Sequence, residues 1–161
     1  MKNKYTIVIL FSFFSILLQF FFAPLLVVNS IKPDFFVIAV IYGSLILMPI
    51  PSMIIAFLGG IILDSYSNMP LGTSAIVYVW GSFVMGYFKK FEYWLGFNFT
   101  VIAVLNIRIV RSFLIGIYIF DTEMSFVSFF ISRVIPETIY TFAFAGILFV
   151  FIRDYVQDLA E

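Results

Sequence analysis

Residues 35–63 read FFVIAVIYGSLILMPIPSMIIAFLGGIIL, a run of 29 residues without a charged side chain. As one helix it would be roughly 43 Å long, which exceeds the ~30 Å hydrocarbon core of a bilayer. Pro49-Ile50-Pro51 lies near its centre, and two prolines so close together are not tolerated in a helix interior. The run is therefore predicted to form two short helices joined at the prolines.

The distribution of Lys and Arg supports this division. With two helices in 35–63 the chain has six spans, and basic residues gather on the cytoplasmic side, as the positive-inside rule requires. The five cytoplasmic ones are Lys2, Lys4, Lys89, Lys90 and Arg153, and the outer one is Lys32. A single span would reverse the bias, to two inside and four outside. We expect six helices with both termini in the cytoplasm, at about 5–28, 35–48, 52–63, 73–88, 93–120 and 126–152.

Composition agrees with an all-α, polytopic membrane protein. Only 11% of the residues are charged and the mean hydropathy is +1.14, whereas soluble domains carry about 25% charged residues. The loops are very short, so residues 1–161 are predicted to be one integral membrane domain whose surroundings are the lipid bilayer. The uncharged run 5–31 is longer than the apolar part of a signal peptide, and we interpret it as a retained helix.

Several functional classes are disfavoured by what the sequence omits. It has no Cys and no His, which removes thiol nucleophiles, zinc–thiolate sites and imidazole bases. The net charge is zero, so no nucleic-acid footprint is expected. No phosphate-binding loop or metal motif is present. We predict no catalytic residue, no cofactor and no metal.

Small and apolar residues suggest how the helices pack. The first helix has no internal charge and is interpreted as a lipid-facing anchor. Small residues recur at helical spacing in the third and fourth helices, which lets backbones approach closely. These residues are Ser52, Ala56 and Gly60, then Ser82 and Gly86. Packing within the chain is favoured over a dimer interface.

Four charged residues lie within the last two helices. Arg108 and Arg111 are three apart and share a helix face, and Arg133 and Glu137 are four apart and share another. Measured from the outer loop that joins these helices, Arg108 lies roughly 18 Å deep and Glu137 roughly 16 Å. We therefore expect Arg108 to meet Glu137 near mid-membrane. Arg111 can meet Glu137 or an acid from the outer rim.

This constellation admits two interpretations. One is a buried ion pair that sets the register of the helices. The other is an outward-open polar pocket that binds an anion or a polar group of a partner. Three arginines against one glutamate leave a positive excess, which Asp34 and Asp64, at the outer ends of two helices, would balance. Both interpretations remain open.

Two motifs lie at the outer ends of the second and third helices. Pro33-Asp34-Phe35-Phe36 opens the second helix, and residues 59–75 read GGIILDSYSNMPLGTSA. Asp64 is predicted to end the third helix at the outer interface. Pro70-Leu71-Gly72 is predicted to form a turn, after which Thr73 or Ser74 would cap the fourth helix. Simple turn chemistry is the main alternative to a partner contact at Pro70 and Gly72.

These two motifs, with the span count and short loops, resemble the bacterial rod shape-determining protein MreD family over the whole chain. The resemblance implies a non-enzymatic scaffold of the cell-wall elongation complex in the bacterial cytoplasmic (inner) membrane. The implied partners are an MreC-like single-span coiled-coil protein, a RodA-type glycan polymerase with a penicillin-binding transpeptidase, and the MreB-type cytoskeleton. It also implies the fold of the substrate-binding subunits of energy-coupling-factor transporters. The charges of the last two helices are not part of the resemblance.

Two other functions remain as alternatives. Six short helices with buried arginines also suit the substrate-binding subunit of an energy-coupling-factor-type vitamin transporter. A membrane enzyme acting on a lipid-linked substrate is less favoured. It would need Asp64 or Glu137 as acid or base and the arginines as phosphate ligands.

Overall fold

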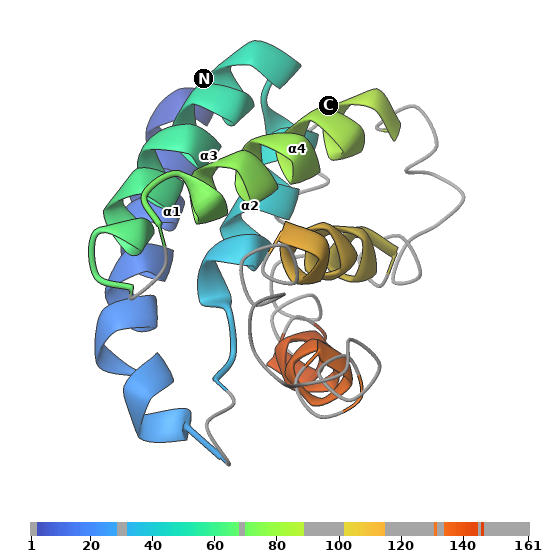
Figure 1. Cartoon of the computed structure of the whole chain (residues 1–161). Helices are drawn as coiled ribbons and strands as arrows, with labels where there is room; N and C mark the ends of the chain where they lie inside the picture. The colour runs from blue at the N-terminus through green and yellow to red at the C-terminus, as the bar shows by residue number, and fades with distance from the viewer. Residues whose placement is uncertain are drawn as a thin grey trace.

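The structure is a computed structural model that describes residues 3–28, 32–67, 70–88, 102–114, 131, 134–144 and 146. The described part is all-α, as predicted. Its helices are α1 (Lys4–Phe21), the 3-10 helix η1 (Ala23–Leu26), α2 (Phe35–Ile46), α3 (Pro49–Asp64) and α4 (Thr73–Phe88). Residues 102–114 and 134–144 are also helical (Figure 1).

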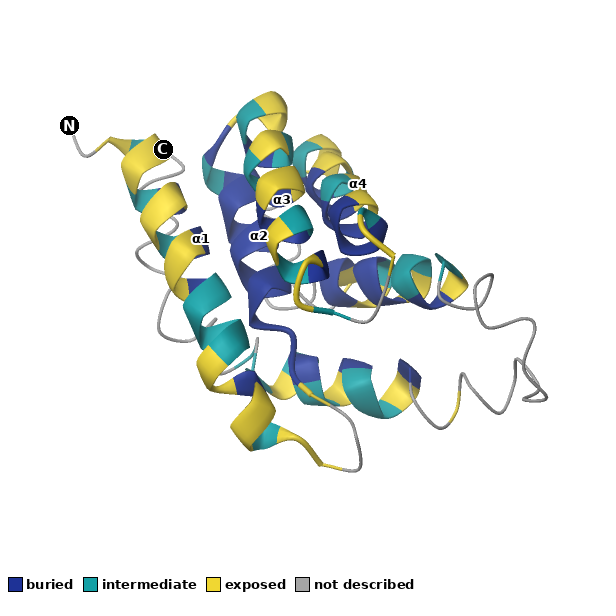
Figure 2. Ribbon diagram, turned by 60° about the vertical axis from the view of Figure 1, so that its left-hand side comes forward, coloured by how far each residue is buried: buried dark blue, intermediate teal, exposed yellow. Residues whose placement is uncertain are grey.

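Helix α2 lies at the centre of the described helices, and α1, α3 and α4 surround it (Figure 2). Every residue of α2 except Ile46 is buried, as expected of a helix that is apolar on all sides. Its side chains form one hydrophobic core with those of α4 and of the 102–114 helix, among them Tyr78 and Ile107. The central position of α2 places its first residues beside the last two helical segments.

Helix α1 covers one side of the bundle and turns an apolar face outward. Leu10, Phe13 and Phe14 are each more than half exposed, at 62%, 59% and 56%. Among the described residues, α1 is the one helix long and apolar enough to cross a membrane, with 18 residues and a mean hydropathy of 1.8. Helices α2, α3 and α4 are apolar but shorter, with 12, 16 and 16 residues.

Two helix boundaries differ from the prediction because of proline. The first helix, expected to reach residue 28, ends at Phe21, and Pro24 lies in the 3-10 turn that follows. Pro49 and Pro51, expected to link two helices, instead form the first turn of α3. The first N–H groups of a helix have no partner within it, so proline loses nothing there. Two further helix ends differ slightly from the predicted residues 48 and 63, since α2 ends at Ile46 and α3 ends at Asp64.

Small residues bring α2, α3 and α4 into close contact. A Cβ on Gly60 would overlap the backbone of Ala75, so glycine is required where α3 crosses α4. Three buried hydroxyls join these helices by hydrogen bonds. The Ser44 hydroxyl donates to the Ser82 hydroxyl at 3.0 Å, and the Ser82 hydroxyl donates to the Ser52 hydroxyl at 2.9 Å. The small-residue rows therefore serve packing within the chain, as favoured from the sequence.

Candidate functional site

The site is built around Asp34, which lies at the start of the central helix α2. It is the N-cap of α2, and its Oδ1 accepts a hydrogen bond from the Val37 N–H at 3.3 Å. The preceding peptide is held by Gln19 of α1. The Gln19 side chain donates to the Pro33 carbonyl at 3.2 Å and accepts from the Phe35 N–H at 2.8 Å. The position of Asp34 is thus set from both sides.

The other carboxylate oxygen of Asp34 accepts two hydrogen bonds and lies near a further cation, all from two helices. Tyr78 of α4 donates its hydroxyl to Oδ2 at 2.9 Å, and Arg111 donates Nη1 to the same oxygen at 2.9 Å. Arg108 Nη2 lies 3.7 Å away. Asp34 and Arg108 are almost fully buried, at 3% and 2% exposure. A buried carboxylate needs this density of donors, because burial without partners is costly.

Arg108 connects this acid to the 134–144 helix. Its Nη1 forms an ion pair with Glu137 Oε1 at 2.6 Å, and its Nη2 donates to the Thr141 hydroxyl. The Asp34 N–H also donates to the Thr141 hydroxyl, at 3.3 Å. The pairing of Arg108 with Glu137 that helix depth predicts is therefore present. Arg111 meets an acid from the outer rim, which is Asp34 rather than Asp64.

We call these four residues, Asp34, Arg108, Arg111 and Glu137, the charged cluster. The third predicted arginine, Arg133, lies outside the described residues. Within the cluster two cations face two carboxylates, so Asp34 removes the positive excess that the two arginines leave when only Glu137 is counted. The cluster ties α2 to the helical segments 102–114 and 134–144.

Asp64 has a different role from the one considered in the charge balance. Its carboxylate accepts hydrogen bonds from the backbone N–H groups of Gly72 at 2.8 Å, Ser74 at 3.0 Å and Ala75 at 3.4 Å. It therefore caps α4 from the end of α3. The expectation that Thr73 or Ser74 caps α4 is wrong, because α4 begins at Thr73, whose hydroxyl donates to the Pro70 carbonyl.

The turn before α4 requires a glycine. Gly72 has a φ of +97°, in the region that residues with a side chain rarely adopt. This conformation directs its N–H to Asp64, while Pro70 supplies the carbonyl that Thr73 binds. The structure brings Asp64, Pro70 and Gly72 together as one turn. Asp34 with Arg108, Arg111 and Glu137 forms a separate group.

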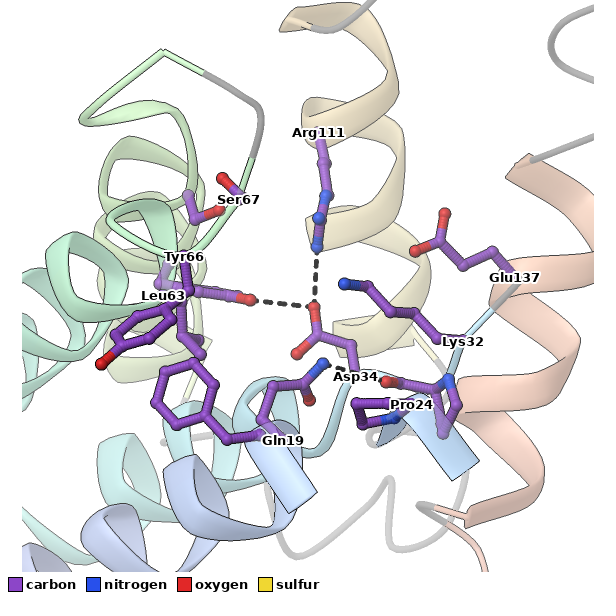
Figure 3. A pocket seen from close by; sticks show the side chains of 13 residues that line it. Gln19, Pro24, Lys32, Asp34, Leu63, Tyr66, Ser67, Arg111 and Glu137 are labelled. Atoms are coloured by element: carbon purple, nitrogen blue, oxygen red, sulfur yellow. Dashed lines mark hydrogen bonds and ion pairs between the residues drawn. The ribbon is translucent and has the colours of Figure 1, made fainter. Parts of the chain in front are cut away.

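A cavity of about 220 Å³ lies between these two groups. Its wall combines polar side chains from α1, α4 and the helical segments 102–114 and 134–144 with the connection that precedes α2, the turn after α3, and apolar side chains of η1 and α3. Figure 3 shows Arg111 descending from its helix to Asp34, and Lys32 extending toward the same pair. The lining residues with charge are Lys32, Asp34, Arg111 and Glu137. The cavity lies beside Arg111 and Glu137, two of the residues for which a polar pocket was considered from the sequence.

Three residues of the site were not singled out from the sequence. Tyr78 lies in an apolar helix, and Gln19 lies in the helix interpreted as a lipid anchor. Thr141 follows Glu137 by four residues, so it shares its helix face. Tyr78 lies near the outer end of its predicted helix and Thr141 lies one helical turn from Glu137, so these two positions carried a usable signal, whereas Gln19 lies near the middle of an uncharged run. Counting only charged residues passed over them.

The chemistry of the site is that of polar contacts between helices. In the described residues the oxygens of Asp34 and Asp64 are engaged by donors, and the Oε1 of Glu137 binds Arg108. Lys32 and Arg111 are the cations at the cavity, and Glu137 and Asp34 are the carboxylates beside them. Arg111 has five N–H donors and uses one of them on a described residue. The arrangement can fix helices in position and can hold a small group with negative charge.

Comparison with known proteins gives a family for the chain. The family model described as rod shape-determining protein MreD matches residues 1–159 of 161. No curated protein matches the chain, and no solved structure matches it. The match covers nearly every residue, including both motifs and the charged cluster. The chain therefore belongs to the MreD family of rod shape-determining proteins.

Proposed function

We propose that this protein is a non-enzymatic scaffold that holds the cell-wall elongation complex at the membrane by binding an MreC-like single-span coiled-coil protein. The observation that carries the proposal is the family match over residues 1–159. Membership makes the chain a bacterial membrane protein with a role in rod shape. A RodA-type polymerase, a penicillin-binding transpeptidase and the MreB-type cytoskeleton are the further partners of the proposed complex.

The proposed topology is a single membrane domain over residues 1–161 with six helices and both termini in the cytoplasm. The lysines and arginines outside the predicted helices support it, since five of these six fall inside on this arrangement. The exposed apolar face of α1 also supports it, because such a face is stable against lipid. On this topology Asp34, the 65–72 turn region and the cavity lie toward the outer face. We further propose the six-helix fold of energy-coupling-factor substrate-binding subunits.

The outer turn offers a surface for the single-span partner. Tyr66 and Leu71 are large and strongly exposed, at 78% and 72%. The Gly72 N–H donates to Asp64 and so ties the residue after Leu71 to the end of α3. Exposed apolar side chains on a backbone anchored in this way favour a contact with a partner, because less conformational freedom is lost on binding.

The proposal is tested in a rod-shaped host. Depletion of the protein is expected to give round, wide cells, and unchanged cell width after verified depletion would refute it. Crosslinking in native membranes and mass spectrometry then identify the partners. Leu71→Ser should reduce recovery of the single-span protein. Ile50→Ser is the matched control, because Ile50 is equally exposed, at 72%, and lies at the other end of α3.

The cavity is the one observation that favours the alternative, a vitamin-binding transporter subunit. Its volume of about 220 Å³ is below the ~300–1,000 Å³ that sites for drug-sized ligands occupy. This difference favours the scaffold. Mass spectrometry of extracts from the purified protein decides the point. A tightly bound vitamin-sized molecule, with paired ATPases among the crosslinked partners, would replace the scaffold proposal.

A further inference from the structure

We infer that the cavity beside the charged cluster binds the phosphate group of an anionic ligand, with Lys32 and Arg111 as its cationic contacts. The inference rests on the proposed topology only for the side on which the cavity opens. The binding itself rests on the charges, donors and volume of the cavity.

Charged side chains of both signs line the cavity. The charged cluster contains two cations and two carboxylates, and each carboxylate is paired with an arginine. Lys32 adds a third cation, and it forms no ion pair with any residue that the structure describes. Its side chain extends into the cavity toward Arg111 and Asp34 (Figure 3). These five residues therefore carry one net positive charge, while Asp64, which is not among the lining residues, directs its carboxylate at the N–H groups of Gly72 and Ser74.

Arg111 and Lys32 supply hydrogen-bond donors at the cavity. Arg111 is partly exposed there, at 21% of its side chain, and Asp34 takes one of its N–H groups. The remaining N–H groups and the Lys32 ammonium are donors without an acceptor among the described residues. Arginine binds phosphate through two parallel hydrogen bonds, and lysine adds a point charge. This pair of residues is well suited to a phosphate.

The volume of the cavity suits a small anionic group. A cavity of about 220 Å³ is too small for a drug-sized ligand, but a phosphate-sized group does not require more. The apolar part of the wall, including Phe20, Pro24 and Leu63, lies beside the polar part. A phosphate attached to a lipid would place its head group between the cations and its glycerol against these side chains. A free phosphate ion would use the cations alone.

The experiment uses the purified full-length protein in neutral detergent and follows its thermal unfolding midpoint. The probes are inorganic phosphate, phosphatidylglycerol and, as the zwitterionic control, phosphatidylcholine, each at an ionic strength matched with sodium chloride. A ligand that binds the folded state raises the midpoint. Lys32→Gln and Arg111→Lys are each expected to weaken binding about tenfold, which corresponds to ~1.4 kcal/mol. Lys4→Gln, with the same change of net charge, is expected to bind as the native protein does.

Each outcome decides the inference. Stabilisation by both inorganic phosphate and phosphatidylglycerol, lost in Lys32→Gln, supports a site open to free phosphate. Stabilisation by phosphatidylglycerol alone, lost in the same variant, supports a lipid head group. The inference is overturned if neither probe stabilises the protein, or if Lys32→Gln responds as Lys4→Gln does. Since no cell or partner protein is involved, a failure here is distinct from a failure of the scaffold proposal.

Discussion

The Ser74 N–H lies 3.0 Å from each carboxylate oxygen of Asp64, ten residues earlier in the chain. The end of one helix thus caps the start of the next. Asp64 is 1% exposed, so its negative charge and the N–H groups it accepts from are withdrawn from solvent together. The acid is therefore a structural element of the turn.

The first prediction follows from this cap. Asp64→Ala should lower the free energy of unfolding by about 1–3 kcal/mol, because it leaves buried N–H groups of α4 without an acceptor. Asp64→Asn, which keeps one acceptor oxygen, should cost less. Thermal unfolding in detergent measures both. Ser65→Ala is the control, since its hydroxyl bond to the Ile61 carbonyl is exposed. An equal loss in Ser65→Ala and Asp64→Ala would contradict the capping role.

The second prediction concerns the buried ion pair. Glu137→Ala should destabilise the protein by about 3–5 kcal/mol, because among the described residues Glu137 is the one carboxylate within hydrogen-bond distance of the buried Arg108, and its loss leaves only Asp34, at 3.7 Å. The double change Arg108→Met and Glu137→Leu should recover much of this loss, since Asp34 keeps Arg111 and Tyr78 as partners. A double variant as unstable as the single one would show that the pairing does not matter for stability.

A third prediction separates two tyrosines of the same helix. Tyr78→Phe removes the hydroxyl that Asp34 accepts and should cost about 1–3 kcal/mol. Tyr87 is 71% exposed, and Tyr87→Phe should stay within about 0.5 kcal/mol of the native protein. Chemical or thermal unfolding of the two variants gives the comparison. Indistinguishable stabilities would mean that Asp34 does not depend on Tyr78.

A fourth prediction tests the close approach of α3 and α4. The added methyl group of Gly60→Ala meets the backbone of Ala75, which cannot move without separating the helices, so a loss of about 1–3 kcal/mol is expected. Gly86→Ala meets a ring carbon of Pro49 at 3.2 Å and should cost less. If the order of the two variants is reversed in thermal unfolding, the helix crossing is not set at Gly60.

The parts of the fold that local chemistry determines were predictable. Helix 73–88 was predicted with the bounds that α4 has, because a Pro-Leu-Gly turn precedes it and two lysines follow it. The double proline was recognised as a boundary. Its place inside the first turn of α3 was missed, because a pair of prolines can either join two helices or begin the second one.

The contacts of the site were predictable where they follow from how deep each residue lies along its predicted helix. Depth brought Arg108 to Glu137 and allowed Arg111 an acid at the outer rim. Depth does not say which helices are neighbours, so it could not choose between Asp34 and Asp64 as that acid. The choice follows from the central position of α2, which depends on the packing of side chains from the other described helices.

The contacts of Asp34 also bear on how the protein is made. The residue is joined to Arg111, 77 residues later, and through its N–H to Thr141, 107 residues later. At a synthesis rate of roughly 5–20 residues per second, Arg111 follows Asp34 out of the ribosome after about 4–15 seconds. During that interval the nascent chain carries the acid without its cation. The contacts that Asp34 makes with Arg111 and Thr141 can therefore form only after the helical segments 102–114 and 134–144 have been synthesised, so the central helix α2 acquires these partners late.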